Sequence, residues 1–208
     1  MPRPARRPGS AARSRAAPAE PSELRIVGGT FRGRRLRYSG DARTRPMKDR
    51  VREAVFNLVG PAVVGSEAID LFAGTGALGL EAISRGAASA IFIEQHRPTA
   101  ALIRQNIEGL EVAVPVEVVA ADTFYWYRHQ AQMSTRPWLV LCSPPFDFFV
   151  ERRDAMLELV QYFVRHAPPG SVVVVESDER FDPAELPRAG EWLVRRYPPA
   201  VVAVLRVP

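Results

Sequence analysis

Short apolar segments alternate with amphipathic ones along most of the chain. Five apolar runs have the length and β-branched content of buried strands, at residues 67–72, 89–94, 116–120, 138–142 and 171–176. The segments between them carry apolar residues at helical spacing, at about 77–85, 97–108, 123–131 and 149–166. Strands and helices in regular alternation favour an α/β fold, in which a parallel sheet is covered by helices on both faces.

The end of the chain departs from this alternation. The segments WLVRRY (192–197) and AVVAVLRV (200–207) both have the composition of strands, and only Pro198 and Pro199 separate them. So short a connection indicates antiparallel strands, because parallel strands need a long crossover. We therefore expect an antiparallel pair at the end of the sheet.

The front of the chain follows other patterns. Its first residues are rich in Pro, Ala, Arg and Ser without apolar periodicity, which is typical of a disordered tail. The segment RIVGGTFRGRRLRY (25–38) alternates apolar residues with arginines around glycines, which predicts a short hairpin with an arginine-rich face. Helical spacing then predicts a helix over 51–60. These patterns divide the chain into a basic tail (1–24), an N-terminal extension of hairpin and helix (25–60) and a main domain (61–208).

Charge is concentrated at the front. Residues 1–50 hold 14 of the 28 Lys and Arg but only 4 of the 23 Asp and Glu, so a basic front precedes a mildly acidic body. Such a front suits a polyanionic partner. The alternative is that its arginines only form a solvated face. The candidate RNA-binding residues are the arginines of the predicted hairpin, namely Arg25, Arg32, Arg34 and Arg35.

Composition disfavours several classes of protein. No apolar run approaches the ~18 residues of a membrane-spanning helix, and the basic start lacks the apolar segment of a secretory signal. A single cysteine, Cys142, cannot form an internal disulfide, which suits the cytoplasm, and we interpret it as a buried strand thiol. The three histidines have no cysteine partners at ligand spacing, so we expect no metal site.

The first predicted strand runs into a glycine-rich turn. In IDLFAGTGALGLEA (69–82), the strand is followed by Gly-Thr-Gly and then by a helix, which is typical of a nucleotide-binding turn. Glu94 ends the second strand, where an acid suits the paired hydroxyls of a ribose. The turn is shorter than G-x-G-x-x-G, and a cofactor without a pyrophosphate needs less anion-binding backbone. This favours S-adenosylmethionine over NAD.

The fourth predicted strand ends in CSPPF (142–146), at the same edge of the sheet as the glycine turn. Two prolines make a stiff exit that has no N–H donors of its own. The Ser143 hydroxyl and the Pro144 carbonyl could then accept the N–H groups of an exocyclic amine, while Phe146 stacks on its base. The alternative is that Pro-Pro only stops the strand.

Together these segments make the chain similar to a known family. FAGTG followed by Pro-Pro-Phe resembles the amino-group methyltransferases with a Rossmann-like seven-strand sheet. The segments RIVGGTFRGRRL, TRPMKDRVREAVFNLV and IDLFAGTGALGLEAISRGA resemble, in order and spacing, the RsmD family of bacterial 16S rRNA guanine-N2 methyltransferases. The resemblance begins near Arg25 and continues to the end of the chain. It implies a cytoplasmic, monomeric enzyme that uses S-adenosylmethionine to methylate guanine N2 in 16S rRNA, on the small ribosomal subunit or a late assembly intermediate.

The resemblance also implies roles for individual residues. The block that closes over the cofactor corresponds to Arg45, Pro46, Arg50 and Glu53. The other cofactor-binding positions are the methionine-side loop Asp70, Phe72, Gly74 and Gly76, the ribose acid Glu94 and the adenine-side Asp122. The catalytic motif is Ser143, Pro144, Pro145 and Phe146, called the SPPF motif below. Glu176 also matches the family's pattern, but no chemistry is assigned to it.

The SPPF motif departs from the family at one position. The family usually has Asp where this chain has Ser143, so a carboxylate able to accept the guanine N2 proton is missing. Serine occurs there in other amino methyltransferases, such as cytosine-N4 enzymes. From the sequence alone, we expect that restoring Asp would keep or raise the rate on guanine, because a carboxylate is the stronger acceptor.

Two alternative functions remain open. Ser143 leaves room for an amino methyltransferase acting on DNA or another RNA, although the chain has no segment for a separate target-recognition domain. A catalytically weak ribosome-assembly factor with the same fold is the second. Aromatic residues 125–127 could stack on a base, but helical packing is the better interpretation.

Overall fold

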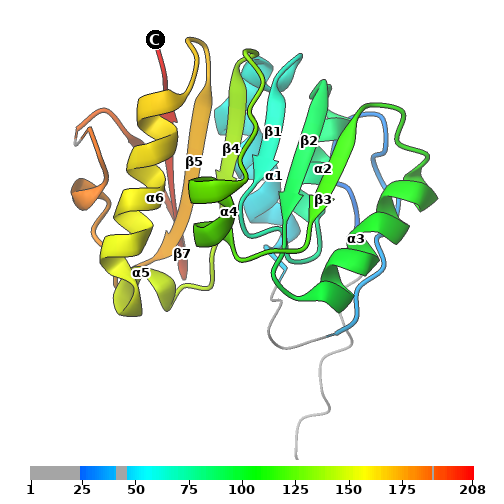
Figure 1. Ribbon diagram of the computed structural model, residues 1–208, viewed down its shortest axis with the longest axis horizontal. Coiled ribbons are helices and arrows are strands. Elements are labelled where there is room, and N and C mark those ends of the chain that lie inside the picture. Colours follow the sequence, from blue (N-terminus) through cyan, green and yellow to red (C-terminus); the bar gives the residue numbers. More distant parts are fainter. Residues whose placement is uncertain (1–23, 41–45, 189) are drawn as a thin grey trace, which may run out of the picture.

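The computed structural model describes residues 24–40, 46–188 and 190–208, and its centre is a seven-stranded sheet (Figure 1). The strands are β1 (Glu67–Asp70), β2 (Ser89–Ile93), β3 (Val116–Val119), β4 (Trp138–Cys142), β5 (Val172–Asp178), β6 (Leu193–Tyr197) and β7 (Ala200–Arg206). Their order is β3-β2-β1-β4-β5-β7-β6. The first five strands are parallel, and β7 lies antiparallel between β5 and β6. The predicted mostly parallel sheet with an antiparallel C-terminal pair is confirmed.

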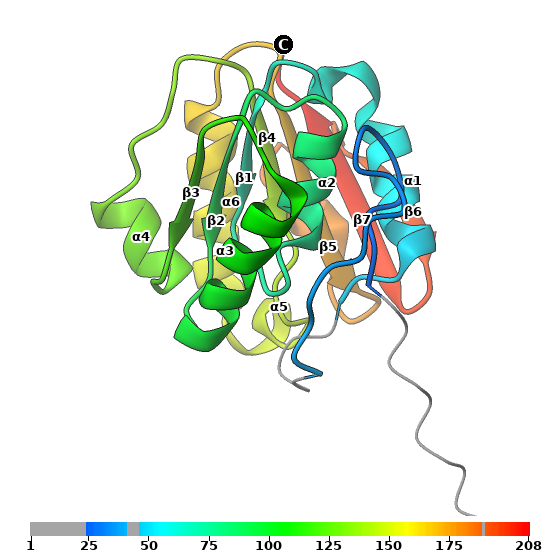
Figure 2. The same cartoon turned by 90° about the vertical axis from the view of Figure 1, so that its right-hand side faces the viewer.

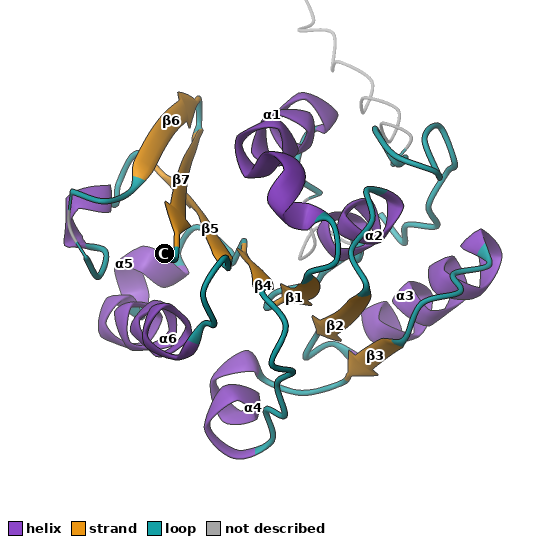
Figure 3. Ribbon diagram, turned by 90° about the horizontal axis from the view of Figure 1, so that it is seen from above, coloured by secondary structure: helices purple, strands orange, loops and turns teal. Residues whose placement is uncertain are grey.

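Helices cover both faces of the sheet (Figure 3). One face carries α1 (Asp49–Val59), α2 (Ala77–Ser84) and α3 (Arg97–Leu110), and the other carries α4 (Thr123–His129), α5 (Phe148–Glu151) and α6 (Arg153–His166). Two short 3₁₀ helices, η1 (Gly60–Val63) and η2 (Pro183–Glu185), complete the elements of the described residues. Apart from Leu24, the predicted basic tail lies outside the described residues, and the domain boundary at residue 60 stays a prediction.

The prediction of one helix over 149–166 is wrong. Arg152 separates α5 from α6 because its backbone, with φ −125° and ψ 31°, leaves the helical region. The Arg152 guanidinium carbon lies 4.2 Å from the centroid of the Phe124 ring and 5.0 Å from that of Phe148. These cation–π contacts to two rings stabilise the side chain at the break.

The parallel strands are buried on both faces, which explains their continuous apolar sequences. Ala68 and Leu139 belong to a hydrophobic cluster shared with α1 and α2. Ile69 and Val140 belong to a second cluster shared with α4 and α6. Two cores thus hold the strands in register, and the carboxyl ends of β1 to β5 share one edge, the lower edge in Figure 1.

The predicted hairpin is present and lies beside α1 and α2 (Figure 2). Arg25 and Arg35 form an antiparallel bridge, and the Ile26 N–H donates to the Arg34 carbonyl over 3.0 Å. Gly29 has φ +73°, and a Cβ atom there would lie 1.9 Å from the carbonyl oxygen of Ser84 in α2. The second glycine of the segment RIVGGTFRGRRL therefore allows a close contact between hairpin and helix.

A buried ion cluster joins the extension to the sheet domain. The side chain of Arg52 in α1 is fully buried, and its Nε lies 3.6 Å from Oε2 of Glu81 in α2, which is equally buried. Glu81 also accepts from Arg85 over 2.7 Å and from the Val27 N–H over 2.8 Å. Because each ion would be costly to bury alone, these contacts couple the hairpin, α1 and α2.

Candidate functional site

A cavity of about 630 Å³ opens where the carboxyl ends of β1, β2, β4 and β5 meet. β1 lies at the centre of the sheet, and the chain proceeds from it to β2 on one side and later to β4 on the other. Parallel α/β sheets bind ligands at such a switch point. The residues before α1 and the turn between β6 and β7 complete the wall.

The glycine turn forms the floor between β1 and α2. Gly74 and Gly76 have φ of 50° and 76°, in the left-handed region that glycine adopts most easily. Phe72 and Gly74 line the cavity, whereas Gly76 does not. A Cβ atom on Gly76 would lie 3.1 Å from Ile103 of α3. Gly76 thus shapes the turn and its packing and is not part of the cavity wall.

Glu94 links the glycine turn to the end of β2. One carboxylate oxygen accepts from the Gly74 N–H over 2.8 Å, and the other accepts from the His96 N–H over 2.7 Å. A carboxylate offers about four acceptor sites, so each oxygen keeps a lone pair for a ligand. Glu94 lines the cavity and presents two fixed acceptors side by side.

Asp70 lies behind the turn and not in the cavity wall. It is buried, and its Oδ2 accepts from the Gly79 N–H over 3.0 Å. Its Oδ1 has no hydrogen-bond partner among the described residues. Burial raises the pKa of Asp70 to about 7, the Gly79 N–H opposes this shift, and the nearby charge of Glu94 adds to it. Asp70 therefore supports the first turn of α2 from below.

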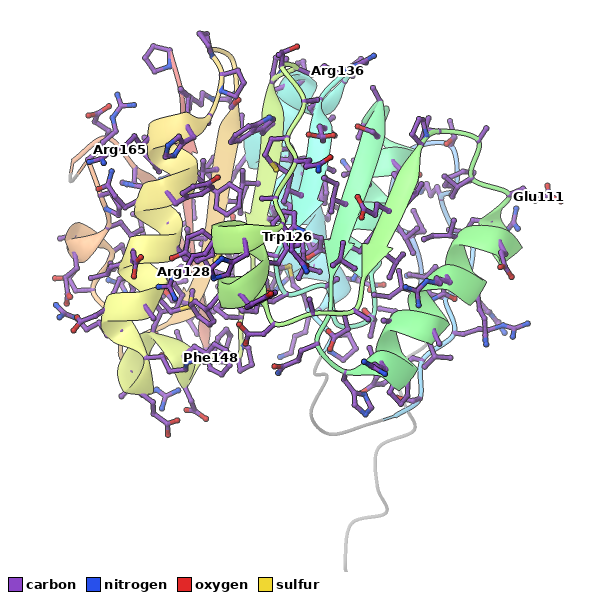
Figure 4. All side chains as sticks on the ribbon, viewed as in Figure 1. Glu111, Trp126, Arg128, Arg136, Phe148 and Arg165 are labelled. Carbon is purple, nitrogen blue, oxygen red and sulfur yellow. The ribbon has the colours of Figure 1, made fainter. Side chains whose placement is uncertain are left out.

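Asp122, Phe72 and Phe148 line one side of the cavity, and the Phe124 ring packs against both phenylalanines. Asp122 caps α4, since its Oδ1 accepts from the Tyr125 N–H over 3.0 Å, and it lines the cavity. Phe72 makes edge contacts with Phe124 and Phe148, with ring centroids 6.1 and 5.9 Å away. Figure 4 shows Phe148 at the lower edge of the molecule. This side offers both an apolar surface and a polar acceptor.

The four residues of the SPPF motif all line the cavity. The Pro145 carbonyl accepts from the Phe148 N–H over 2.9 Å, which fixes the turn into α5. The Ser143 hydroxyl donates to the carboxylate of Glu176, a buried residue of β5 that also lines the cavity. Burial raises the pKa of Glu176, and the hydrogen bond from Ser143 lowers it.

The block from Arg45 to Glu53, which includes the start of α1, is only partly in the cavity. Pro46 and Arg50 line it, and Arg45 lies outside the described residues. Glu53 lies apart, in a small cleft of about 190 Å³ beside the hairpin. Glu53 follows Arg50 by three residues and so lies nearly one turn further along α1, beside the hairpin.

Sequence reasoning missed other residues of the wall. Met47 and Lys48 precede α1, and residues 197–200 form the turn between β6 and β7. Lys48 could have been suspected as the only lysine of the chain. The sequence of the turn between β6 and β7 has no residue type that indicates a binding site. The turn reaches the cavity because β7 pairs with β5 in the antiparallel direction.

The hairpin arginines are exposed, as an RNA-binding surface requires. Arg25 forms an ion pair of 3.1 Å with Asp49 of α1, and Arg34 donates to the Gly109 carbonyl at the end of α3 over 2.6 Å. These contacts orient the guanidinium groups without burying them. Their RNA-binding role stays a prediction.

Other sequence interpretations can be compared with the structure. Cys142 is a buried strand thiol, and burial raises its pKa, so it is unreactive. Trp126 and Tyr127 pack in the core, whereas Tyr125 is 55% exposed. Within the described part of the chain, no helix is long and apolar enough to cross a membrane, and no group of three or more His, Cys, Asp or Glu is placed to hold a metal ion.

Comparisons with known proteins add independent findings. A family model described as conserved hypothetical protein 95 matches residues 24–197. Ribosomal RNA small subunit methyltransferase D of Haemophilus influenzae is 30% identical over 162 residues, covering 78% of this chain and 82% of that protein. The protein of the same name from Escherichia coli K12 is 40% identical over 124 residues, covering 60% and 61%.

Solved structures agree with the observed fold. The yhhF protein of Escherichia coli superimposes with a TM-score of 0.70 at 30% identity, covering 88% of this chain and 97% of that one. An RNA methyltransferase from Salinibacter ruber, in complex with S-adenosyl-L-homocysteine, superimposes with a TM-score of 0.55 at 20% identity, covering 79% and 94%. At that identity the second likeness concerns the fold alone.

Proposed function

The chain belongs to the conserved hypothetical protein 95 family, the family of the RsmD ribosomal RNA methyltransferases, and on this premise we propose that it methylates the exocyclic N2 of a guanine in the 16S rRNA of the small ribosomal subunit. The methyl donor in this proposal is S-adenosylmethionine, and the reaction takes place in the cytoplasm. The observation that carries the proposal is the cavity, which brings Glu94, the glycine turn and the SPPF motif to one place.

The residues present fit S-adenosylmethionine. The paired acceptors of Glu94 suit the two hydroxyls of a ribose, and the side of the cavity at Asp122 suits an adenine. Pro46 and Arg50 would close over the methionine part from the front of the chain. When bound, this cofactor supplies an electrophilic methyl group on a sulfonium.

The SPPF motif would hold the target base beside that methyl group. The Ser143 hydroxyl and the Pro144 carbonyl would accept the N–H groups of the amine, and Phe146 would stack on the base. The rigid Pro-Pro exit keeps these acceptors in place, and misplacing a reacting atom by ~1 Å can cost on the order of a hundredfold in rate. The hairpin arginines would bind rRNA phosphates and so position the subunit.

Methyl transfer from labelled S-adenosylmethionine to small subunits tests this proposal. The subunits come from a strain that lacks the modification, and a nucleoside digest identifies the product. We expect N2-methylguanosine from subunits and little from protein-free rRNA. Absence of labelled subunits, or labelling of DNA instead, would refute the proposal.

A second candidate function is methylation of another nucleic acid amine, and Ser143 is the observation that favours it. Serine at this position also occurs in enzymes that methylate cytosine N4. The same digest separates the two functions, because it distinguishes N4-methylcytosine from N2-methylguanine. A catalytically weak assembly factor would bind S-adenosylhomocysteine poorly, which calorimetry measures.

A further inference from the structure

The strand β6 lies at one edge of the sheet and carries two adjacent arginines, Arg195 and Arg196. Both side chains are exposed, and neither forms an ion pair with an acid among the described residues. The segment before β6 differs, because Arg188 pairs there with Glu191. The positive charge of β6 is therefore not neutralised within the part of the chain that the structure describes, and an anionic partner can use it.

The two arginines lie on opposite faces of the sheet. Residues directly opposite each other in an antiparallel pair share a face, and Arg195 is opposite Val202, which belongs to the hydrophobic cluster shared with α1 and α2. Tyr197 packs against the same cluster. Successive residues of a strand alternate between faces, so Arg196 lies with Val194 on the face of α4 and α6.

Arg195 lies close to the cavity. Tyr197 is part of the cavity wall and follows Arg195 by two residues on the same face, which is roughly 7 Å along a strand. The Arg195 Nη1 donates to the Val194 carbonyl over 2.9 Å. A guanidinium has five N–H donors in a planar fork, so this contact orients the group and leaves other donors for a ligand.

The helix α1 separates this arginine from those of the hairpin. Figure 3 shows α1 between the hairpin and the pair formed by β6 and β7, and Arg206 of β7 donates to two carbonyl groups at the end of α1. At the other end of the helix, Lys48 and Arg50 are exposed and line the cavity. Exposed cations thus lie on both sides of α1 and at its start, beside the cavity.

We propose that Arg195 binds a phosphate of the rRNA next to the target nucleotide, so that β6 forms a second RNA-binding surface, on the other side of α1 from the hairpin. This inference rests on the proposed function. An enzyme that modifies a base draws the nucleotide out into its pocket, and the strand on both sides of that nucleotide then stays at the mouth of the cavity. The hairpin holds one side of the strand, and Arg195 holds the other through charge-assisted hydrogen bonds to phosphate.

The experiment measures the Kd of the full chain for small subunits over a range of salt concentrations, together with kcat and KM of methyl transfer. Arg195→Ala should raise Kd and KM by about tenfold, the scale of one hydrogen bond to a charged group, and should lower the slope of log affinity against log salt concentration by about one unit. Its kcat and its S-adenosylhomocysteine affinity by calorimetry should stay the same. Arg196→Ala is the matched control, because Arg196 is an exposed arginine of the same strand on the opposite face.

The control also separates RNA binding from another role of charge on an edge strand. Charged side chains at an edge discourage pairing with a second chain, and an arginine on either face serves that purpose. Equal losses in Arg195→Ala and Arg196→Ala, or a Kd and salt slope in Arg195→Ala equal to those of the wild type, would therefore overturn the inference. If the wild type labels subunits and Arg195→Ala binds them equally well, only this inference fails, whereas unlabelled wild-type reactions refute the proposed function.

Discussion

Removing the Glu94 carboxylate tests how the cavity holds its cofactor. In the structure this carboxylate accepts from the backbone N–H groups of Gly74 and His96, over 2.8 and 2.7 Å, and faces the cavity with its remaining lone pairs. Glu94→Ala therefore removes two acceptors from the ligand and also releases the glycine turn from the end of β2. Both changes act on cofactor binding.

The magnitude follows from the polar groups left unpaired. Hydroxyls that lose their partner in a closed site cost about 1–3 kcal/mol, which is roughly a 5- to 150-fold rise in Kd. Gly74 and His96 are only partly buried, so water can reach their free N–H groups and the loss of folding stability should stay small. The effect should thus appear in binding much more than in unfolding.

Isothermal calorimetry with S-adenosylhomocysteine measures the affinity, and thermal unfolding checks the fold. Glu117→Ala is the matched control, because Glu117 is an exposed glutamate on the adjacent β3. Glu94→Gln should be nearly as harmful as Glu94→Ala, since an amide can accept from only one of the two N–H groups. An affinity equal to that of the wild type in Glu94→Ala would show that Glu94 does not hold the ribose.

Three further predictions concern the front of the chain and the interior. Arg52→Ala should lower the free energy of unfolding by at most about 3–5 kcal/mol, because it breaks a buried ion pair and leaves Glu81 with Arg85 as its charged partner. Denaturant unfolding measures this, and Arg128→Ala, which breaks an exposed pair with Glu158, should cost at most about 1 kcal/mol. Asp70 has a folded pKa of about 7 against an ordinary 3.8, so the native state binds the extra proton and stability falls as pH rises from about 4 to about 7, by at most about 4 kcal/mol. Asp70→Asn should flatten that part of the pH–stability curve, and an unchanged slope would contradict the raised pKa. Replacing Arg32, Arg34 and Arg35 together by glutamate should weaken binding to the subunit. The slope of log affinity against log salt concentration should fall by roughly two to three units. An unchanged slope would show that these arginines only form a solvated face.

Much of the fold is predictable because its signals are local. Each buried strand is a continuous run of β-branched and aliphatic residues, as in VVVVE of β5, and the glycine turn follows β1 directly in sequence. The break at Arg152 is different, since it coincides with contacts to the Phe148 ring of α5 and to the Phe124 ring of α4, which is distant in sequence. The helical pattern over 149–166 does not indicate those contacts, so it does not predict the break at Arg152.

In the candidate site, too, the sequence predicts the position of some residues, whereas packing decides the position of others. Glu94 and the SPPF motif lie at strand ends, where topology alone brings them to one edge. Glu53 and Gly76 also match the family's motifs, but neither lines the cavity. Glu53 lies beside the hairpin, and Gly76 packs against Ile103 of α3. Sequence similarity identified the segments, and packing decides which of their residues reach the cavity.

The Ser143 position shows why a departure from a family pattern has to be interpreted in three dimensions. Along the chain, the missing Asp is a lost acceptor, and restoring it looks favourable. Across the sheet, β5 already brings the carboxylate of Glu176 to the same point, 33 residues away in sequence, and its contact with Ser143 keeps a negative group beside the motif. By the same resemblance Glu176 also matches the family's pattern, so an acid at position 143 stands beside this glutamate in that family, and Ser143→Asp should keep or raise the rate of methyl transfer. A lower rate in Ser143→Asp than in the wild type, with unchanged S-adenosylhomocysteine affinity by calorimetry, would show that the contact between Ser143 and Glu176 makes serine the better acceptor in this chain.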